Sequence, residues 1–137
     1  MSKALGVDLG TVRTGIAVEA VGIAQPVAVL TQTGDELVSA VAAAARDLGA
    51  TEIVVGLPLR LDGTDGPAAE RSRAFADALR DATELPVALW DERLTTAESE
   101  RALVGAGVRR RKRREVVDRV AATVMLQGYL DRGRQKR

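Results

Sequence analysis

The sequence contains no cysteine and no histidine among its 137 residues. Without cysteine it can form no disulfide framework, thiolate nucleophile, iron-sulfur cluster or cysteine-ligated zinc site. Without histidine it can form no Ser-His-Asp triad, no histidine general base and none of the usual histidine-rich metal sites. Any chemistry must therefore use carboxylates, arginine, lysine or hydroxyl groups. A bound metal would be a hard cation held by oxygen atoms, such as Mg²⁺, Mn²⁺ or Ca²⁺.

Aromatic residues and long apolar runs are also scarce. Phe75, Trp90 and Tyr129 are the three aromatic residues, too few for a surface that stacks several bases, so contact with a nucleic acid would be mostly with phosphates. No apolar run approaches the roughly 20 residues that a membrane helix needs, and no apolar signal stretch opens the chain. We expect one cytoplasmic domain over residues 1–137, without membrane contact, ending in a basic tail that frays from about residue 132.

Charge is divided unevenly along the chain although the formal net charge is only +1. Residues 1–108 contain nine basic and sixteen acidic side chains, whereas residues 109–137 contain eleven basic and three acidic ones. This division predicts a polyanion-binding end attached to an acidic body. A basic segment that is simply solvated remains the alternative. The densest part is a run of six cations: Arg109, Arg110, Arg111, Lys112, Arg113 and Arg114.

The pattern of apolar residues predicts an α/β protein with a mixed five-stranded sheet flanked by helices. Alternating or short buried apolar segments indicate strands, and apolar residues at helical spacing indicate helices, one of which Gly49 should end. The expected strands span residues 4–9, 14–19, 26–30, 52–55 and 86–90. The expected helices span residues 35–48, 68–82, 95–104 and 115–131.

Two of these strands carry candidate catalytic carboxylates. Asp8 lies on the same predicted strand face as two glycines, Gly6 and Gly10, so no side chain would shield it from a metal ion or a phosphate. Asp91 and Glu92 end a buried strand, where open α/β sheets place their ligand sites. Adjacent strand residues point to opposite faces, so only one of this pair can face Asp8. We favour Glu92 and expect Asp91 to bind backbone donors or Arg93; a turn or helix-capping role is the simpler alternative for each acid.

The third candidate is Asp118, on the last predicted helix. It shares a helix side with the small or apolar residues Ala121, Ala122 and Met125, although an ion pair with a neighbouring arginine is an alternative. Carboxylates from two strands and a helix are what a two-metal phosphoryl-transfer site requires, with Mg²⁺ or Mn²⁺ as the cation. Such a site would allow a chain without histidine to hydrolyse a phosphodiester bond. Zinc is not expected, because no histidine or cysteine exists to bind it.

Four segments of the chain resemble, in order and spacing, the YqgF family, also called RuvX, Holliday junction resolvases or pre-16S rRNA nucleases. They are residues 8–17 (DLGTVRTGIA), 55–58 (VGLP), 91–96 (DERLTT) and 117–122 (VDRVAA). The resemblance implies a ribonuclease H-like fold, with Asp8, an acid of the Asp91-Glu92 pair and Asp118 as metal-binding catalytic carboxylates. It also implies trimming of the 5′ end of the small-subunit rRNA precursor in the cytoplasm. Arg60 departs from the pattern, since the family has a small polar residue such as Asn there.

The preferred function is therefore a metal-dependent nuclease acting on structured RNA and associated with ribosomal particles, with Arg13 and the basic run 109–114 contacting nucleic acid. Branched DNA at a Holliday junction is the alternative substrate, and phosphate contacts alone do not distinguish the two. A non-catalytic RNA-binding assembly factor is a further alternative, against which the presence of all three acids argues. An actin-like phosphotransferase is disfavoured by length, because such enzymes close two domains around ATP. The sequence leaves oligomeric state and endo or exo cleavage open.

Overall fold

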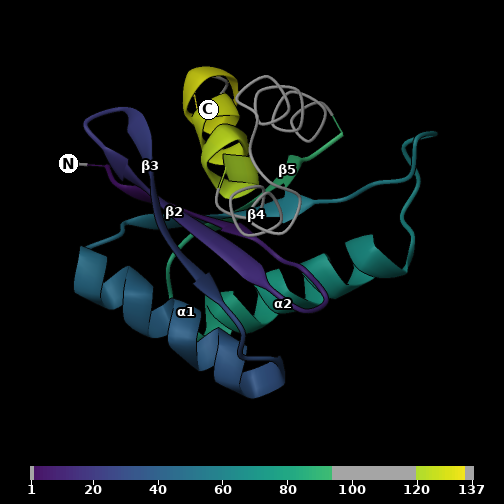
Figure 1. Cartoon of the computed structure of the whole chain (residues 1–137), viewed down its shortest axis with the longest axis horizontal. Coiled ribbons are helices and arrows are strands. Elements are labelled where there is room, and N and C mark those ends of the chain that lie inside the picture. The colour runs from purple at the N-terminus through teal and green to yellow at the C-terminus, as the bar shows by residue number, and fades with distance from the viewer. Residues whose placement is uncertain (1, 94–119, 135–137) are drawn as a thin grey trace, which may run out of the picture.

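The computed structural model describes residues 2–93 and 120–134. Within them, five strands form one mixed sheet in the order β3-β2-β1-β4-β5 (Figure 1). The predicted α/β class with a mixed five-stranded sheet is therefore confirmed. The strands are β1 (Ala4–Asp8), β2 (Thr14–Ala20), β3 (Ile23–Leu30), β4 (Glu52–Leu57) and β5 (Val87–Asp91), and the helices α1 (Gly34–Leu48) and α2 (Pro67–Thr83). Residues 120–128 are α-helical and run into η1 (Tyr129–Gly133), a π-helical turn; residues 120–133 are called the C-terminal helix below.

The order of the strands brings the carboxyl ends of β1, β4 and β5 to one edge of the sheet. β1 is antiparallel to β2, which is antiparallel to β3, whereas β1 and β5 both run parallel to β4. In register, Asp8 pairs with Gly15 of β2, and Leu57 pairs with Asp91 of β5. The acids at the ends of β1 and β5 therefore lie on either side of the end of β4.

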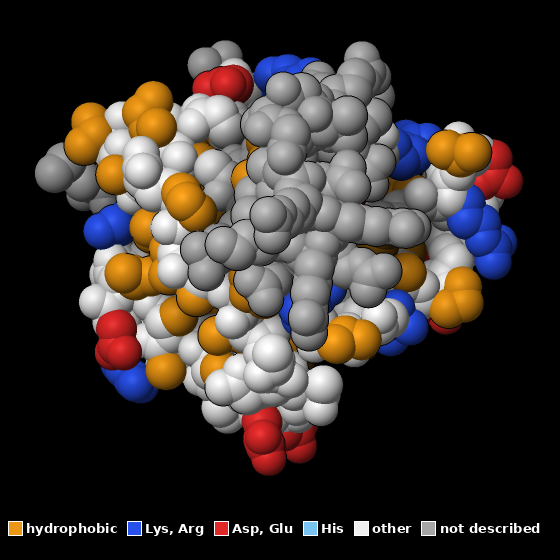
Figure 2. Space-filling model, viewed as in Figure 1, with side chains coloured by type: hydrophobic (Ala, Val, Ile, Leu, Met, Phe, Trp, Pro, Cys, Tyr) orange, Lys and Arg blue, Asp and Glu red, His pale blue; other side chains and the backbone are white. Residues whose placement is uncertain are grey.

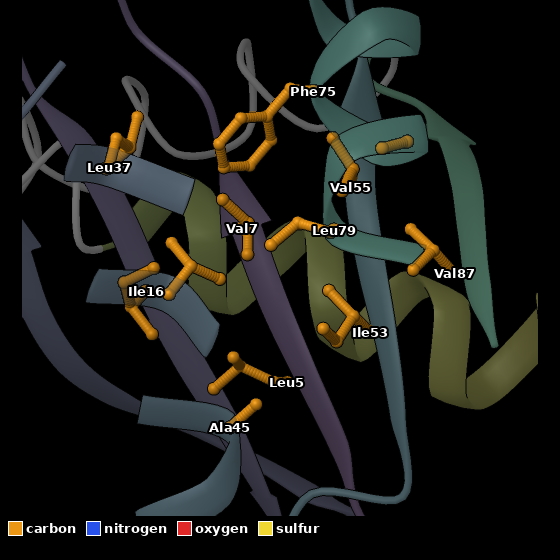
Figure 3. Packing of buried hydrophobic residues seen from close by; sticks show 12 residues of the cluster. Leu5, Val7, Ile16, Leu37, Ala45, Ile53, Val55, Phe75, Leu79 and Val87 are labelled. Atoms are coloured by element: carbon orange, nitrogen blue, oxygen red, sulfur yellow. The ribbon is translucent and has the colours of Figure 1, made fainter. Parts of the chain in front are cut away.

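One face of the sheet is covered by α1 and α2 (Figure 1). Alternate strand residues such as Leu5, Val7, Ile53 and Val55 pack there against apolar helix residues such as Leu79 (Figure 3). Full burial of such a side chain stabilises the fold by about 1.5–3 kcal/mol. α1 ends at Gly49, whose positive φ of 71° is the left-handed conformation that glycine adopts readily, as predicted.

The opposite face of the sheet is covered by the C-terminal helix (Figure 1). Ala4, Ala17 and Val54 pack there against helix residues that include Met125 and Leu126. Gly6 allows the close approach, because a Cβ atom at this position would lie 2.9 Å from the Cβ of Leu126. The two faces thus differ in character, with large aliphatic residues under α1 and α2 and small ones under the C-terminal helix.

The structure corrects the expected boundaries in three places. β4 continues to Leu57 rather than ending at residue 55. β3 begins at Ile23 rather than at residue 26, because the β2-β3 turn is made by Val21 and Gly22, both with positive φ. The tail expected to fray from about residue 132 is wrong for residues 132–134: the helix continues to Gly133, and Arg134 forms an ion pair with the buried Glu19. Residues 135–137, the helix expected over residues 95–104 and the start of the helix expected from residue 115 lie outside the described residues.

Much of the exposed apolar surface in the view of Figure 2 lies over the β2-β3 edge of the sheet. Hydrophobic side chains gather on the left of Figure 2, and the exposed large ones of this hairpin are Val21, Ile23 and Val27. β3 is the outer strand on that side, and it contains Pro26, which has no N–H to offer a further strand. None of the helices in the described part of the chain combines the length and the apolar character needed to cross a membrane.

Candidate active site

Asp8 ends β1 on the face covered by the C-terminal helix. The alternation along β1 is strict: Leu5 and Val7 lie in the core under α1 and α2, whereas Gly6 lies under Leu126 on the other face. Asp8 falls on the same face as Gly6 and is partly buried. This is the orientation that the sequence pattern predicts.

Glu92 follows β5 and lies over the end of β4. Its backbone N–H donates to the Leu57 carbonyl at 3.2 Å, which continues the parallel pairing one residue beyond β5. Its carboxyl group occupies the space above Gly56, where a Cβ atom would collide with Glu92 Oε1. There it shares a hydrogen bond with the carboxyl group of Asp8. The structure thus brings Asp8 and Glu92 together on one face, as expected for the acid favoured from the sequence.

The electrostatics of this pair depend on burial and on like charge. Removal from water raises the pKa of Glu92 to about 10, and the hydrogen bond with Asp8 and the negative charges of Asp8 and Asp91 act in the same direction. Without a cation, Glu92 is therefore protonated at neutral pH and donates its proton to the Asp8 carboxylate. Two carboxyl groups this close require either a shared proton or a bound cation between them.

Asp91 points away from this pair, because adjacent strand residues alternate. Both its oxygens are held by Arg93, with Nη2 to Oδ2 at 2.6 Å and Nε to Oδ2 at 2.9 Å. The Arg93 backbone N–H also donates to Asp91 Oδ1 at 3.0 Å. This ion pair holds the pKa of Asp91 below its usual value. The expected pairing of Asp91 with Arg93 is therefore observed.

A loop of residues 58–66 extends away from the sheet after β4 (Figure 1). It is fastened internally by hydrogen bonds from Arg60 N–H to the Thr64 carbonyl at 2.9 Å and from the Thr64 hydroxyl to Asp62 Oδ1 at 2.6 Å. Arg93 Nη1 donates to the Leu61 carbonyl at 3.4 Å and so ties the loop to the end of β5. Arg60 packs against Gly66, where a Cβ atom would lie 3.0 Å from its Nε.

Sequence reasoning missed the role of Gly56. This glycine interrupts an otherwise apolar buried strand, and such an interruption is a signal of close approach by another group; here the group is the Glu92 carboxyl. It also missed the tie between Arg93 and the loop 58–66, because the two segments are about thirty residues apart and no local pattern links them.

The other predicted site residues are placed only in part. Arg13 directly precedes β2 and lies two residues from Gly15, the register partner of Asp8. The predicted third acid and the predicted basic run lie outside the described residues: Asp118 and Arg109, Arg110, Arg111, Lys112, Arg113 and Arg114.

The described acids suit a hard cation. No group of three potential metal-ligating His, Cys, Asp or Glu residues is found among residues 2–93 and 120–134. Asp8 and Glu92 nevertheless supply adjacent carboxylate oxygens, the ligands that Mg²⁺ and Mn²⁺ prefer. Because their hydrogen bond needs a proton that a cation could replace, these two residues fit a metal site.

Comparison with known proteins adds a family and a fold. Residues 2–132 match the family model RuvX, described as Holliday junction resolvase. A protein of Geobacillus kaustophilus and one of Anaeromyxobacter sp. strain K, each named "Putative pre-16S rRNA nuclease", are 46% identical over 134 residues and 49% identical over 133. These matches cover 94% and 95% of this chain and 97% of each relative.

The solved structures include a similar chain, T. thermophilus RuvC in complex with a Holliday junction substrate. It superposes with a TM-score of 0.59 at 16% sequence identity, covering 97% of each chain. A second RuvC structure from Thermus thermophilus gives a TM-score of 0.55 at 14% identity. At this identity the likeness concerns the fold, and it confirms the predicted ribonuclease H-like architecture.

Proposed function

The chain belongs to the RuvX family, and from this premise we propose that it is a metal-dependent nuclease that processes the 5′ end of pre-16S rRNA. The observation that carries the proposal is the pair of carboxyl groups of Asp8 and Glu92. They meet at the carboxyl edge of three parallel strands, where Gly56 leaves room for the Glu92 carboxyl group. Such a pair of oxygen ligands suits a divalent cation that assists phosphodiester hydrolysis, a route that needs no histidine.

Each residue of the site has a distinct proposed role. Asp8 and Glu92 hold their oxygens on one face of the sheet, and Asp118 is proposed as the third carboxylate. A divalent cation, Mg²⁺ or Mn²⁺, when bound there would activate a water molecule and stabilise the leaving oxygen. Gly56 has no side chain and therefore leaves room for the Glu92 carboxyl group. Asp91 stays outside the pair and fixes Arg93, which in turn anchors the loop 58–66 at the edge of the site.

Substrate binding is proposed to rely on cations at this edge. Arg13 follows the turn after Asp8, and the run 109–114 precedes Asp118 in the sequence. Arginine suits phosphates because its planar guanidinium donates two parallel hydrogen bonds to their oxygens. We propose that these residues bind the RNA backbone, that the protein works in the cytoplasm and that ribosomal particles present its substrate.

A second candidate substrate is the Holliday junction, favoured by the description of the matching family and by the junction bound to the structurally similar RuvC. The curated relatives, which are far more similar in sequence, carry an rRNA-processing name instead. We therefore place RNA first.

The test offers the purified protein a pre-16S rRNA fragment, a four-way DNA junction and an unstructured single-stranded RNA. Each is incubated with Mn²⁺ or Mg²⁺, with EDTA, or with a chelator selective for zinc. We expect cleavage of the precursor near the mature 5′ end, abolished by EDTA and unaffected by the zinc chelator. Cleavage of the four-way junction alone would identify branched DNA as the substrate. Tight binding without cleavage of any substrate would favour the assembly-factor alternative and overturn the proposal.

A further inference from the structure

A surface cavity of about 520 Å³ lies on the face of the sheet opposite the Asp8-Glu92 pair. Its walls come from three segments: the turn after β1, the connection from β3 to α1 with the start of α1, and the first half of α2. Small-molecule sites in proteins have volumes of about 300–1,000 Å³, so the cavity is large enough for a planar ring. It is called the α1-α2 pocket below.

The lining of the α1-α2 pocket combines an apolar floor with a polar rim. Leu9, Leu37, Val38 and Phe75 provide apolar surface. The rim supplies donors and acceptors from four residues: Gln32 and Thr33 can do both, Arg71 donates and the Asp35 carboxylate accepts. A simple anion matches this rim poorly because of the Asp35 carboxylate. An uncharged planar ring with donors and acceptors along its edge matches both the floor and the rim.

The pocket adjoins the catalytic carboxylate through the backbone. Leu9 directly follows Asp8, so the two Cα atoms are about 3.8 Å apart while their side chains face opposite sides of the sheet. A nucleic-acid strand that crosses the end of β1 can therefore place a phosphate beside Asp8 and a neighbouring base in the pocket.

The turn that separates the two sites is tightly closed. A Cβ atom at Gly10 would collide with the carbonyl oxygen of Arg13, so a side chain at this position would force the turn open. Gly10 and Thr11 of this turn both line the pocket. The pocket wall and the cation Arg13, proposed to bind phosphate, are therefore joined by a short, constrained segment.

We propose that the α1-α2 pocket binds an unpaired nucleobase of the RNA next to the cleaved bond. This inference rests on the proposed nuclease function for its substrate class, and it adds a specificity site. A single base that leaves its stack is recognised by an apolar surface against its ring and polar groups along its edge. The enzyme then prefers cleavage positions that are flanked by an unpaired base.

Two matched substitutions in α2 test the pocket. Ala74 lines it and is exposed, so Ala74→Trp fills it. Ala82, also exposed and in the same helix, lines a smaller depression of about 270 Å³ at the other end of α1 and α2, so Ala82→Trp is the control. Circular dichroism and thermal unfolding establish that both variants fold. If Ala74→Trp does not fold, Arg71→Gln, which changes the rim at an exposed position, takes its place.

Binding is measured by NMR on the metal-free protein, titrated with the four ribonucleoside 5′-monophosphates and with ribose 5-phosphate. We expect at least one nucleotide to shift the amide signals of Gly10, Thr11 and Gly34, whereas ribose 5-phosphate leaves them unchanged. Ala74→Trp should weaken the binding of that nucleotide by about tenfold or more, and Ala82→Trp should leave its binding unchanged. Equal shifts with ribose 5-phosphate, or no shifts with any nucleotide, would overturn the proposal.

A cleavage assay is the second test of the pocket. An RNA with one abasic residue beside the scissile bond should be cut more slowly than the intact RNA by the unmodified protein and by Ala82→Trp. Ala74→Trp should cut both RNAs at the same reduced rate. Equal cutting of the two RNAs by the unmodified protein contradicts the base site. Absence of any cleavage instead removes the proposed nuclease function, and the nucleotide titration then decides on the pocket alone.

Discussion

The negative charge of Asp8 is the property that the proposed metal site needs from this residue. It has small neighbours on its own face, and it shares a hydrogen bond with Glu92. Asp8→Asn preserves the shape of the side chain and an oxygen that can still accept the Glu92 proton, but it removes the charge that would hold a cation. We expect cleavage to fall by at least about a hundredfold, a loss of about 3 kcal/mol of transition-state stabilisation, and thermal stability to be nearly unchanged. Single-turnover cleavage, gel-shift binding and thermal unfolding check this; undiminished turnover would remove Asp8 from the mechanism.

Glu92 and Asp91 form a natural matched pair of substitutions. Glu92→Gln keeps a donor that can reach the Asp8 carboxylate, so the fold should persist while one oxygen ligand is lost. Asp91→Asn removes an ion pair with Arg93 whose side chains are 38% and 35% exposed, which costs about 0–1 kcal/mol at most. We expect the Glu92 variant to lose at least about tenfold more activity than the Asp91 variant. The opposite order would show that Asp91 is the functional acid.

The raised pKa of Glu92 also predicts how a cation binds. The proton shared with Asp8 has to leave before both carboxylates can ligate a metal, so metal and proton compete. Because the pKa is raised, the competition extends through neutral pH, and Mn²⁺ affinity should increase steadily between about pH 6 and about pH 8. Calorimetric titration at several pH values measures this. Glu92→Gln should bind Mn²⁺ more weakly and with little dependence on pH; an equally steep dependence in that variant would contradict the assignment.

At the level of single residues, the sequence predicts orientation well where one strand face is buried. The alternation of Leu5 and Val7 with Gly6 and Asp8 determines which face Asp8 occupies, since a shift by one residue would expose the apolar set. The same argument applied to Asp91 and Glu92 predicted that only one of them can face Asp8; it favoured Glu92 without excluding Asp91, and the structure places Glu92 there. It could not reveal the position of Gly56 beneath Glu92, because that contact joins neighbouring strands about 35 residues apart in the chain.

At the scale of elements, the end of the C-terminal helix is held to the sheet by buried charged groups. Glu19 of β2 accepts hydrogen bonds from Arg134 Nη2 at 2.6 Å and Nη1 at 2.9 Å, and from the Ala4 backbone N–H at 3.0 Å. Arg134 Nη2 also lies 3.5 Å from Glu52 Oε2, and the Tyr129 hydroxyl donates to Glu52 Oε1 at 2.6 Å. These contacts tie the end of the helix to the edge of the sheet that is remote from Asp8.

Removal of Arg134 should therefore destabilise the protein in a pH-dependent way. The hydrogen bonds from Arg134 are the main cause that lowers the pKa of Glu19 below 4.5. A carboxyl with a lowered folded pKa contributes stability that is fully present above its unfolded pKa and is lost as the pH falls through the folded value. Arg134→Gln should lower the free energy of unfolding by about 2 kcal/mol at pH 7. Below about pH 4.5, the stability of the variant should fall less steeply with pH than that of the unmodified protein.

Chemical denaturation at several pH values measures both effects. Arg132→Gln is the matched control, because it makes the same change at an exposed position two residues earlier in the helix. A similar loss of stability in the two variants would show that the Glu19 contact contributes nothing beyond the general charge.

The elements also show where local patterns fail. The end of α1 at Gly49 was predictable, because a glycine after the last apolar position signals a left-handed cap. The start of β3 was not, because the turn places the β-branched Val21 at a φ of 49°, which sequence patterns disfavour. The link between Glu19 and Arg134 spans 115 positions, and no periodicity can report a contact of that range.

For the molecule as a whole, the order of the strands is the feature that creates the site. Local patterns predict strands and helices but do not say that β1 lies between β2 and β4, which is what brings Asp8 beside Glu92. The sequence suggested that these acids share a site, but the ribonuclease H-like fold that would bring them together was predicted through the family resemblance. The chain's overall charge division, in contrast, is visible in the sequence alone.

This charge division leads to a prediction about salt. If the run 109–114 binds phosphates, each lost contact should reduce the slope of log K against log salt by roughly 0.7 to 0.9. Replacing Arg110, Arg111 and Arg113 with Gln should weaken binding to every nucleic acid tested and flatten the slope by about two units, with little change in thermal stability. The matched control replaces Arg46, Arg73 and Arg80, exposed arginines of α1 and α2, by the same residue. It has the same net charge, so a general field effect would change both variants alike, whereas direct contact would flatten the slope only in the first. An unchanged slope in the first variant would mean that the run does not touch the substrate, and the acidic body with its basic end would then have to meet ribosomal particles through a different face.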